Sequence, residues 1–168
     1  MPKTKIAYFG VFTALALILS YVETFIPITF GIPGIKLGLP NLIIVVALYR
    51  LANLETLLIS ITRIMLAGLL FSGLFAILFG LSGGVISLFV MASLKRTDRF
   101  SVMGVSVAGG VSHNMAQLAI AMVVLETTYI LYYLPLLLIS GVVAGLLIGI
   151  VSNEIIKKIG AMHYTIAP

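Results

Sequence analysis

Residues 56–79 read TLLISITRIMLAGLLFSGLFAILF, an apolar stretch that is interrupted by one permanently charged side chain, Arg63. About 20 apolar residues are enough to cross the hydrocarbon core of a bilayer as a helix. A charge near the centre of such a helix costs roughly 2.5–3.5 kcal/mol on insertion scales, so it should face the protein interior or a wet cavity. Arg63 therefore predicts both a membrane helix and a candidate site.

The composition extends this interpretation to the whole chain. Its 168 residues are 61% hydrophobic and 9% charged, and the mean hydropathy is +1.25. These values are typical of an integral membrane protein, so we expect one transmembrane domain over residues 1–168, with no room for a soluble catalytic or nucleotide-binding domain. The chain contains no cysteine, which excludes disulfides and thiolate chemistry.

Apolar runs predict six membrane spans. Each should be a helix, because a helix satisfies its own backbone hydrogen bonds in hydrocarbon and no period-two pattern indicates a barrel. The fold class is therefore an all-α bundle of six transmembrane helices. The predicted spans are Ile6–Val22, Leu39–Tyr49, Leu54–Phe71, Phe75–Leu94, Ser101–Leu125 and Leu134–Ile156.

The basic residues predict the orientation of the chain. The net charge is +5, but eight of the ten Lys and Arg residues lie in segments on one side of the six spans, where topology explains them better than nucleic-acid binding does. Both termini are therefore expected in the cytoplasm of a multi-pass membrane protein. The eight residues are Lys3, Lys5, Arg50, Lys95, Arg96, Arg99, Lys157 and Lys158.

The fifth span carries three polar side chains, His113, Asn114 and Gln117, at a depth similar to that of Arg63. Helical spacing places His113 and Gln117 on one face. We expect these groups and Arg63 to line one central cavity, where the guanidinium would bind an anionic substrate group. Two alternatives remain: hydrogen bonds between helices for the fifth span, and a structural ion pair of Arg63 with Glu23 or Glu126.

Lys36 and Asn41 lie where the second span begins. The preceding segment, Pro27–Pro40, is rich in proline and glycine, so it should form an irregular outer loop folded over or into the bundle. The positive end of the second helix near Lys36 would attract anions. An exposed connector with a solvated lysine is the alternative.

The residue inventory argues against catalysis. Asp98 is the only aspartate, and the two histidines are separated from most of the five acidic residues. Aspartate-rich magnesium sites and zinc clusters therefore cannot be assembled, and no phosphate-binding loop motif is present. We expect no catalytic residue, metal or cofactor.

Four motifs resemble those of a small bacterial membrane family called Gx transporters, also labelled heptaprenyl diphosphate synthase component I. In chain order they are PGIKLGLPN at 33–41, LLFSG at 69–73, LSGG at 81–84 ahead of Lys95-Arg96, and GVSHNMAQ at 110–117. The resemblance implies similarity to the six-helix substrate-binding subunits (S components) of energy-coupling factor vitamin transporters. Those subunits dock on a shared transmembrane coupling subunit driven by two ATPases.

Docking in those subunits uses small residues on the cytoplasmic half of the first helix, and Gly10 and Ala14 lie at the matching place here. The leading hypothesis is therefore a transport subunit that binds a small anionic or amphipathic molecule from outside a bacterial cell. A non-catalytic membrane partner of a prenyl diphosphate synthase is the alternative, and a stand-alone channel or carrier is a third. Small residues of the other spans, such as Gly141, Gly145 and Gly149, are expected to pack helices together.

Overall fold

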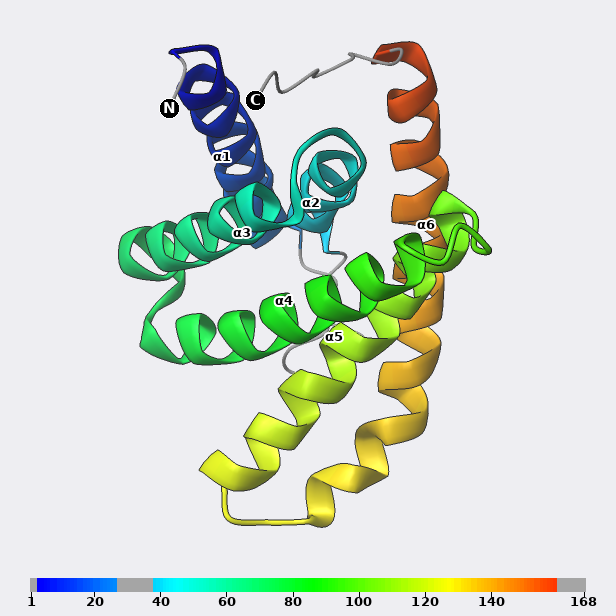
Figure 1. Cartoon of the computed structure of the whole chain (residues 1–168). Coiled ribbons are helices and arrows are strands. Elements are labelled where there is room, and N and C mark those ends of the chain that lie inside the picture. Colours follow the sequence, from blue (N-terminus) through cyan, green and yellow to red (C-terminus); the bar gives the residue numbers. More distant parts are fainter. Residues whose placement is uncertain (1–2, 27–37, 160–168) are drawn as a thin grey trace.

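The computed structural model describes residues 3–26 and 38–159, and this part of the chain is helical without any strand (Figure 1). The predicted all-α fold is confirmed there, and the predicted spans differ from the helices by only a few residues at their ends. A π-helical turn, Gly68–Ser72, extends the third helix, and a short 3-10 helix, Tyr129–Tyr133, precedes the last. The α-helices are α1 (Lys3–Thr24), α2 (Leu39–Arg50), α3 (Asn53–Ala67), α4 (Leu74–Lys95), α5 (Val102–Val124) and α6 (Leu134–Ile159).

Five of these helices are long and apolar enough to cross a membrane, which makes the chain a multi-pass membrane protein. The exception is α2, whose 12 residues span roughly 18 Å and cannot cross a hydrocarbon core of about 30 Å. Five of the six predicted spans are therefore long enough to cross the membrane among the described residues, and the predicted count of six transmembrane helices is not confirmed. A short apolar helix of this length is typical of a buried core element.

The helices contact one another in a ring, in the order α1, α3, α4, α5, α6, α2 and back to α1. In Figure 1, α3 and α4 run side by side across the direction of α6, and α2 lies among α1, α3 and α6. The core forms around α2, whose residues 44–48 are all buried. The other core side chains come from α3 to α6: Ile59, Leu88, Met91, Val105 and Ile148.

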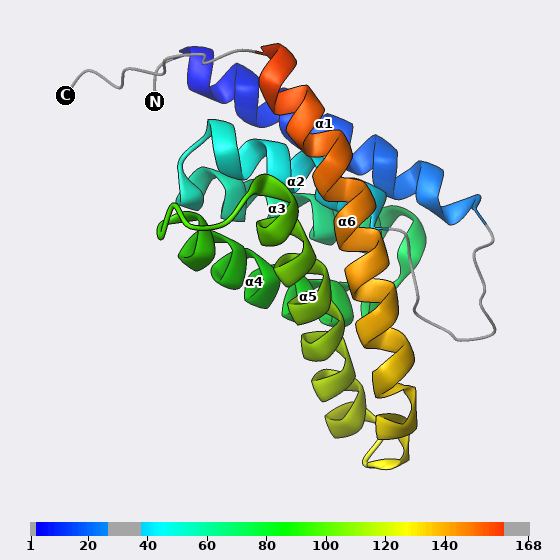
Figure 2. The ribbon, with the colours of Figure 1, turned by 90° about the vertical axis from the view of Figure 1, so that its right-hand side faces the viewer.

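Basic side chains join the ends of α2, α4 and α6. The guanidinium of Arg50 donates to the carbonyl oxygen of Ile156, and Lys95 Nζ donates to the carbonyl oxygen of Leu48 at 2.5 Å. These bonds satisfy carbonyl groups in the last turns of α6 and α2, which have no partner within their own helices. The ends of α2, α4 and α6, which the sequence analysis places on the cytoplasmic side of the membrane, are therefore in contact. The first turn of α1 and the last turn of α6 also lie at the same end of the molecule (Figure 2).

Glycines allow α5 and α6 to approach at backbone distance. A Cβ atom at Gly145 would lie 2.6 Å from Val107 Cα, and one at Gly110 would lie 2.4 Å from the carbonyl oxygen of Gly141. In lipid there is no hydrophobic drive between helices, so close contact and dispersion hold such pairs together. The predicted packing role of these glycines is confirmed at this interface.

We predict that Gly145→Ala lowers the melting temperature of the purified protein, because the added methyl group meets backbone atoms that cannot move aside. Overpacking of this kind costs about 1–3 kcal/mol. Gly10→Ala is the matched control, since a Cβ atom there meets nothing within 4 Å. Thermal unfolding in detergent measures both variants, and equal melting temperatures would contradict the packing role of Gly145.

Candidate functional site

Arg63 is buried, with 9% of its surface exposed, at the contact between α3 and α1. Its Nη1 donates to Ser20 Oγ at 3.4 Å, and the same hydroxyl donates to the carbonyl oxygen of Ala16. The Nε group is buried and has no hydrogen-bond partner in the described part of the chain. A guanidinium has five N–H donors, so most of the capacity of Arg63 is not used by these contacts.

Arg63 belongs to a buried stripe of small, hydroxyl and charged side chains on α1 and α3. The sequence analysis did not single out the other members of this stripe. On each helix the members are three or four residues apart, so they lie on one face. All of them are buried, and Thr13 Oγ1 has no partner among the described residues. The 3-and-4 spacing of small and hydroxyl side chains within apolar runs is the sequence signal that would have revealed this stripe. It consists of Thr13, Ala16 and Ser20 on α1 and Thr56, Ser60 and Arg63 on α3.

Glu23, in the last turn of α1, binds the start of α2. Its Oε1 accepts hydrogen bonds from the backbone N–H groups of Gly38 and Leu39 at 2.5 and 3.2 Å. Gly38 has a φ of 73°, a left-handed conformation that glycine adopts without strain, and this turns the chain into the helix. The predicted anion-attracting end of α2 is thus occupied by a carboxylate of the protein itself.

The Glu23 carboxylate also attracts the Arg63 guanidinium through space. The two side chains form no hydrogen bond or ion pair with each other, and the ion pair found in the described residues joins Lys157 to Glu154. Glu126, the other suggested partner of Arg63, is exposed in the connection after α5. The structural ion pair suggested for Arg63 is therefore not formed with either carboxylate.

The polar residues of α5 point in different directions. Asn114 Nδ2 donates to the carbonyl oxygen of Leu137 at 2.8 Å and to Ser140 Oγ at 3.1 Å, both on α6. His113 packs against α4, where a Cβ atom at Gly83 would lie 2.8 Å from its Nε2. Gln117 is partly buried, and its side-chain amide forms no hydrogen bond within the described residues. For Asn114, the alternative of a hydrogen bond between helices is what the structure shows.

Five of the six predicted substrate residues lie in the described part of the chain, and the contacts of three of them are with different helices. Arg63 contacts α1, whereas the contacts of His113 and Asn114 are with α4 and α6. Asn41 lies beside Gly38 at the start of α2, where Ile148 of α6 also approaches. Lys36 and most of the Pro27–Pro40 loop lie outside the described residues. Among the described residues, the structure divides the expected central cavity into separate polar groups.

Gly10 and Ala14 are exposed on α1. They belong to an outward face whose larger members include Ile6, Val11 and Ile18, each more than half exposed. The buried stripe of α1 occupies the other side, because Thr13, Ala16 and Ser20 face the interior. The first helix therefore presents small residues away from the bundle, which is the geometry that docking by close backbone approach requires.

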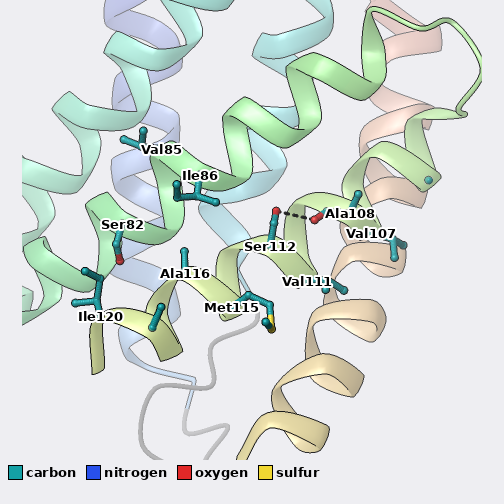
Figure 3. A pocket seen from close by; sticks show the side chains of 12 residues that line it. Ser82, Val85, Ile86, Val107, Ala108, Val111, Ser112, Met115, Ala116 and Ile120 are labelled. Atoms are coloured by element: carbon teal, nitrogen blue, oxygen red, sulfur yellow. Dashed lines mark hydrogen bonds between the residues drawn. The ribbon is translucent and has the colours of Figure 1, made fainter. Parts of the chain in front are cut away.

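An apolar groove of about 930 Å³ lies between α4 and α5 (Figure 3). Small residues form much of its α5 wall, and none of the predicted substrate residues lines it. Its position follows from two helices that pack tightly at one face, with His113 against Gly83 and Met91 against Gly109, and spread apart at the other. The lining residues are Ser82, Val85, Ile86, Gly104, Val107, Ala108, Val111, Ser112, Met115, Ala116, Ala119 and Ile120.

A protein-family model described as heptaprenyl diphosphate synthase component I matches residues 12–155, which is most of the chain. The chain belongs to this family. The match covers the buried Arg63 stripe, the α4–α5 groove and the glycine contacts of α5 with α6. Comparison with curated proteins and with solved structures found no match. Membership of the heptaprenyl diphosphate synthase component I family implies a partner component of a synthase.

The described residues contain no group of three or more His, Asp and Glu side chains arranged to hold a metal ion. The polar groups of these helices are a guanidinium, hydroxyls, amides and an imidazole, which can bind and orient a ligand by hydrogen bonding. This chemistry suits recognition of an anion.

We predict that Glu23→Ala lowers the thermal stability of the purified protein, because two N–H groups at the start of α2 lose their acceptor. Loss of a helix cap costs about 0.5–2 kcal/mol. Glu23→Gln keeps an acceptor oxygen and should lose less. Glu154→Ala is the control, since Glu154 is exposed and bonds only to Lys157 among the described residues. An equal melting temperature for Glu23→Ala and Glu154→Ala would contradict the capping role.

Proposed function

We propose that the chain is a substrate-binding membrane subunit of an energy-coupling factor type uptake transporter in a bacterial cell membrane, with both termini in the cytoplasm. Its substrate is a small anionic or amphipathic metabolite related to isoprenoids, quinones or vitamins. The chain itself is not an enzyme. It binds substrate and works with a shared transmembrane coupling subunit and two ATPases, because a single transmembrane domain brings no energy source of its own.

The buried guanidinium of Arg63 carries this proposal. Packing alone does not need a charge in an apolar helix, and the observed contacts of Arg63 are one long bond to Ser20 and a distant attraction to Glu23. A buried donor without a partner costs about 1–3 kcal/mol. An anionic ligand would offset that cost, since carboxylates and phosphates match the planar donor fork of arginine.

The remaining site assignments are part of the same proposal. Asn41 and Lys36 would contribute from the start of α2 and the loop before it, and His113 and Gln117 would contribute from α5. Asn114 would act mainly by fixing α5 on α6, because its amide already has two partners there. A ligand that contacts both Arg63 and the polar residues of α5 would have to extend from the α1–α3 contact to α5.

The family description favours a second candidate, a non-catalytic membrane component that partners a heptaprenyl diphosphate synthase. The single aspartate supports a non-catalytic role, because diphosphate chemistry relies on magnesium held by several carboxylates. The two candidates differ in their partner. Co-purification with ATPases supports the transporter, and co-purification with a soluble synthase supports the second candidate.

We predict that Arg63→Gln reduces the amount of small anionic molecule retained by the purified protein at least tenfold. Glutamine still offers an N–H donor to Ser20 but carries no charge, and a hydrogen bond to a charged group is worth about 1.5–3 kcal/mol. Mass spectrometry of the denatured protein identifies and quantifies the ligand. Lys158→Gln, which removes a charge at an exposed site, is the control. Unchanged retention in a folded, monodisperse Arg63→Gln variant would reduce Arg63 to a structural charge.

We predict that Ala14→Trp prevents assembly with the coupling subunits, because the large ring blocks close approach of the partner backbone to α1. Gly10→Leu should act in the same direction. Neither change should alter ligand retention by the isolated protein, since both positions face outward. Co-purification after co-expression is the measurement, with Ala119→Trp on the exposed surface of α5 as the control. A full yield of complex with Ala14→Trp would refute the docking surface.

A further inference from the structure

The buried stripe of α3 can be followed from Arg63 to the surface along one face of the helix. Positions 56, 60, 63, 67 and 71 are three or four residues apart, so they share that face. Ala67 is buried, whereas Phe71, at the end of the series, is half-buried. Beyond the guanidinium, the side chains on this face are therefore a methyl group and then an aromatic ring.

The ring of Phe71 meets the ring of Tyr21 on α1. Their centroids are 5.4 Å apart and their planes are inclined at 66°, which is an edge-to-face contact. Tyr21 directly follows Ser20, whose hydroxyl accepts the hydrogen bond from Arg63. The ring contact therefore joins α1 to α3 next to the residues that form the Arg63–Ser20 bond.

Exposure rises sharply at this ring contact. Ser20 and Arg63 are 7% and 9% exposed, whereas Tyr21 is 50% exposed. In the opposite direction along the stripe, Thr56 and Ser60 are 0% and 2% exposed. The route from the surface to the guanidinium that crosses the fewest buried side chains of the stripe therefore passes the two rings.

Phe71 is carried by the π-helical turn Gly68–Ser72, which forms the corner between α3 and α4 at the left of Figure 1. The two ends of this turn are packed differently. An added Cβ atom at Gly68 would clash with the side chain of Ile77, so this end is held against α4. Gly73, directly after the turn, has a φ of 85° and a ψ of 169°, a conformation nearly restricted to glycine, and a Cβ atom there would meet nothing within 4 Å. The turn is thus anchored at one end and has open space at the other.

We propose that the Tyr21–Phe71 contact is the gate to the Arg63 site, and that the π-helical turn opens it by moving Phe71 away from α1. The inference rests on the proposed binding of an anion at Arg63, since a guanidinium that bound no ligand would need no entry. On the predicted topology this end of α1 and α3 faces the outside of the cell. That is the side from which a substrate of an uptake subunit arrives.

The strength of the contact suits a gate. An edge-to-face aromatic pair changes an equilibrium by only about two- to tenfold beyond the surface that it buries. Thermal motion can therefore break it, while the two rings still cover more of the stripe than small side chains would. The alternative is that the rings only pack α1 against α3. A gate sets the rate at which a solute reaches the stripe, whereas a packing contact sets stability, so the two roles can be measured separately.

A thiol placed beside Arg63 reports access to the stripe. The chain contains no cysteine, so Ser20→Cys introduces a single thiol at the residue that Arg63 contacts. The folded, purified protein is treated with the anionic reagent sulfonatoethyl methanethiosulfonate, and mass spectrometry follows the labelling rate. We expect slow labelling of Ser20→Cys, and a rate about three- to tenfold higher when Phe71→Ala removes the ring. Phe71→Tyr keeps an aromatic ring and should restore slow labelling.

Two further variants make the result specific to the ring contact. Phe75→Ala is the matched control, because Phe75 is 68% exposed near the same corner and forms no ring contact within the described residues. Tyr21→Ala removes the other ring and should act like Phe71→Ala, and it decides the question if Phe71→Ala does not fold. An equal increase with Phe75→Ala, or no increase with either ring variant, would overturn the gate.

A cationic reagent separates the gate from the anion site. If Arg63 attracts anions, the anionic reagent should label Ser20→Cys faster than trimethylammonioethyl methanethiosulfonate does, and Arg63→Gln should abolish this preference. Faster labelling with Phe71→Ala but no charge preference would retain the gate and contradict the anion site. A charge preference without faster labelling would support the anion site and refute the gate.

Discussion

The short helix α2 imposes the constraint on which the other contacts depend. It is too short to cross a bilayer, yet it lies in the core, so the polar groups at its two ends must find partners inside the protein. Glu23 supplies an acceptor for its first N–H groups, and Lys95 supplies a donor for the carbonyl of Leu48. These three bonds tie α1 and α4 to α2. Arg50, at the end of α2, extends the connection to α6.

The same constraint places Arg63 beside a charge of opposite sign. Because Glu23 has to lie at the start of α2, its carboxylate also comes close enough to the α1–α3 contact to attract the guanidinium. Its Oε1 accepts from two backbone N–H groups, and Glu23 forms no close ion pair with Arg63. The result is a buried cation that is electrostatically compensated in part and keeps free donors.

The helices were predictable because a run of apolar residues bounded by Gly, Pro or charge has one stable conformation in lipid. The arrangement of the side chains was less predictable. His113 and Asn114 are adjacent in sequence, but the turn of about 100° per residue directs them to α4 and α6, and only the neighbours of α5 decide what each one meets. The spacing of Thr56, Ser60 and Arg63 puts them on one face of a helix, a pattern that the sequence analysis did not use. The partner of that face on α1 could be known only from the structure.

The Arg63 stripe and the α4–α5 groove differ in chemistry because the first is buried between helices and the second is open on the outside of the ring. The Arg63 stripe is enclosed between α1 and α3, where low polarity strengthens a charge interaction and favours a small anion. The enclosed region is the one that the proposed transport function uses, because it holds the buried charge. The open groove offers mostly apolar atoms to the bilayer that would surround it.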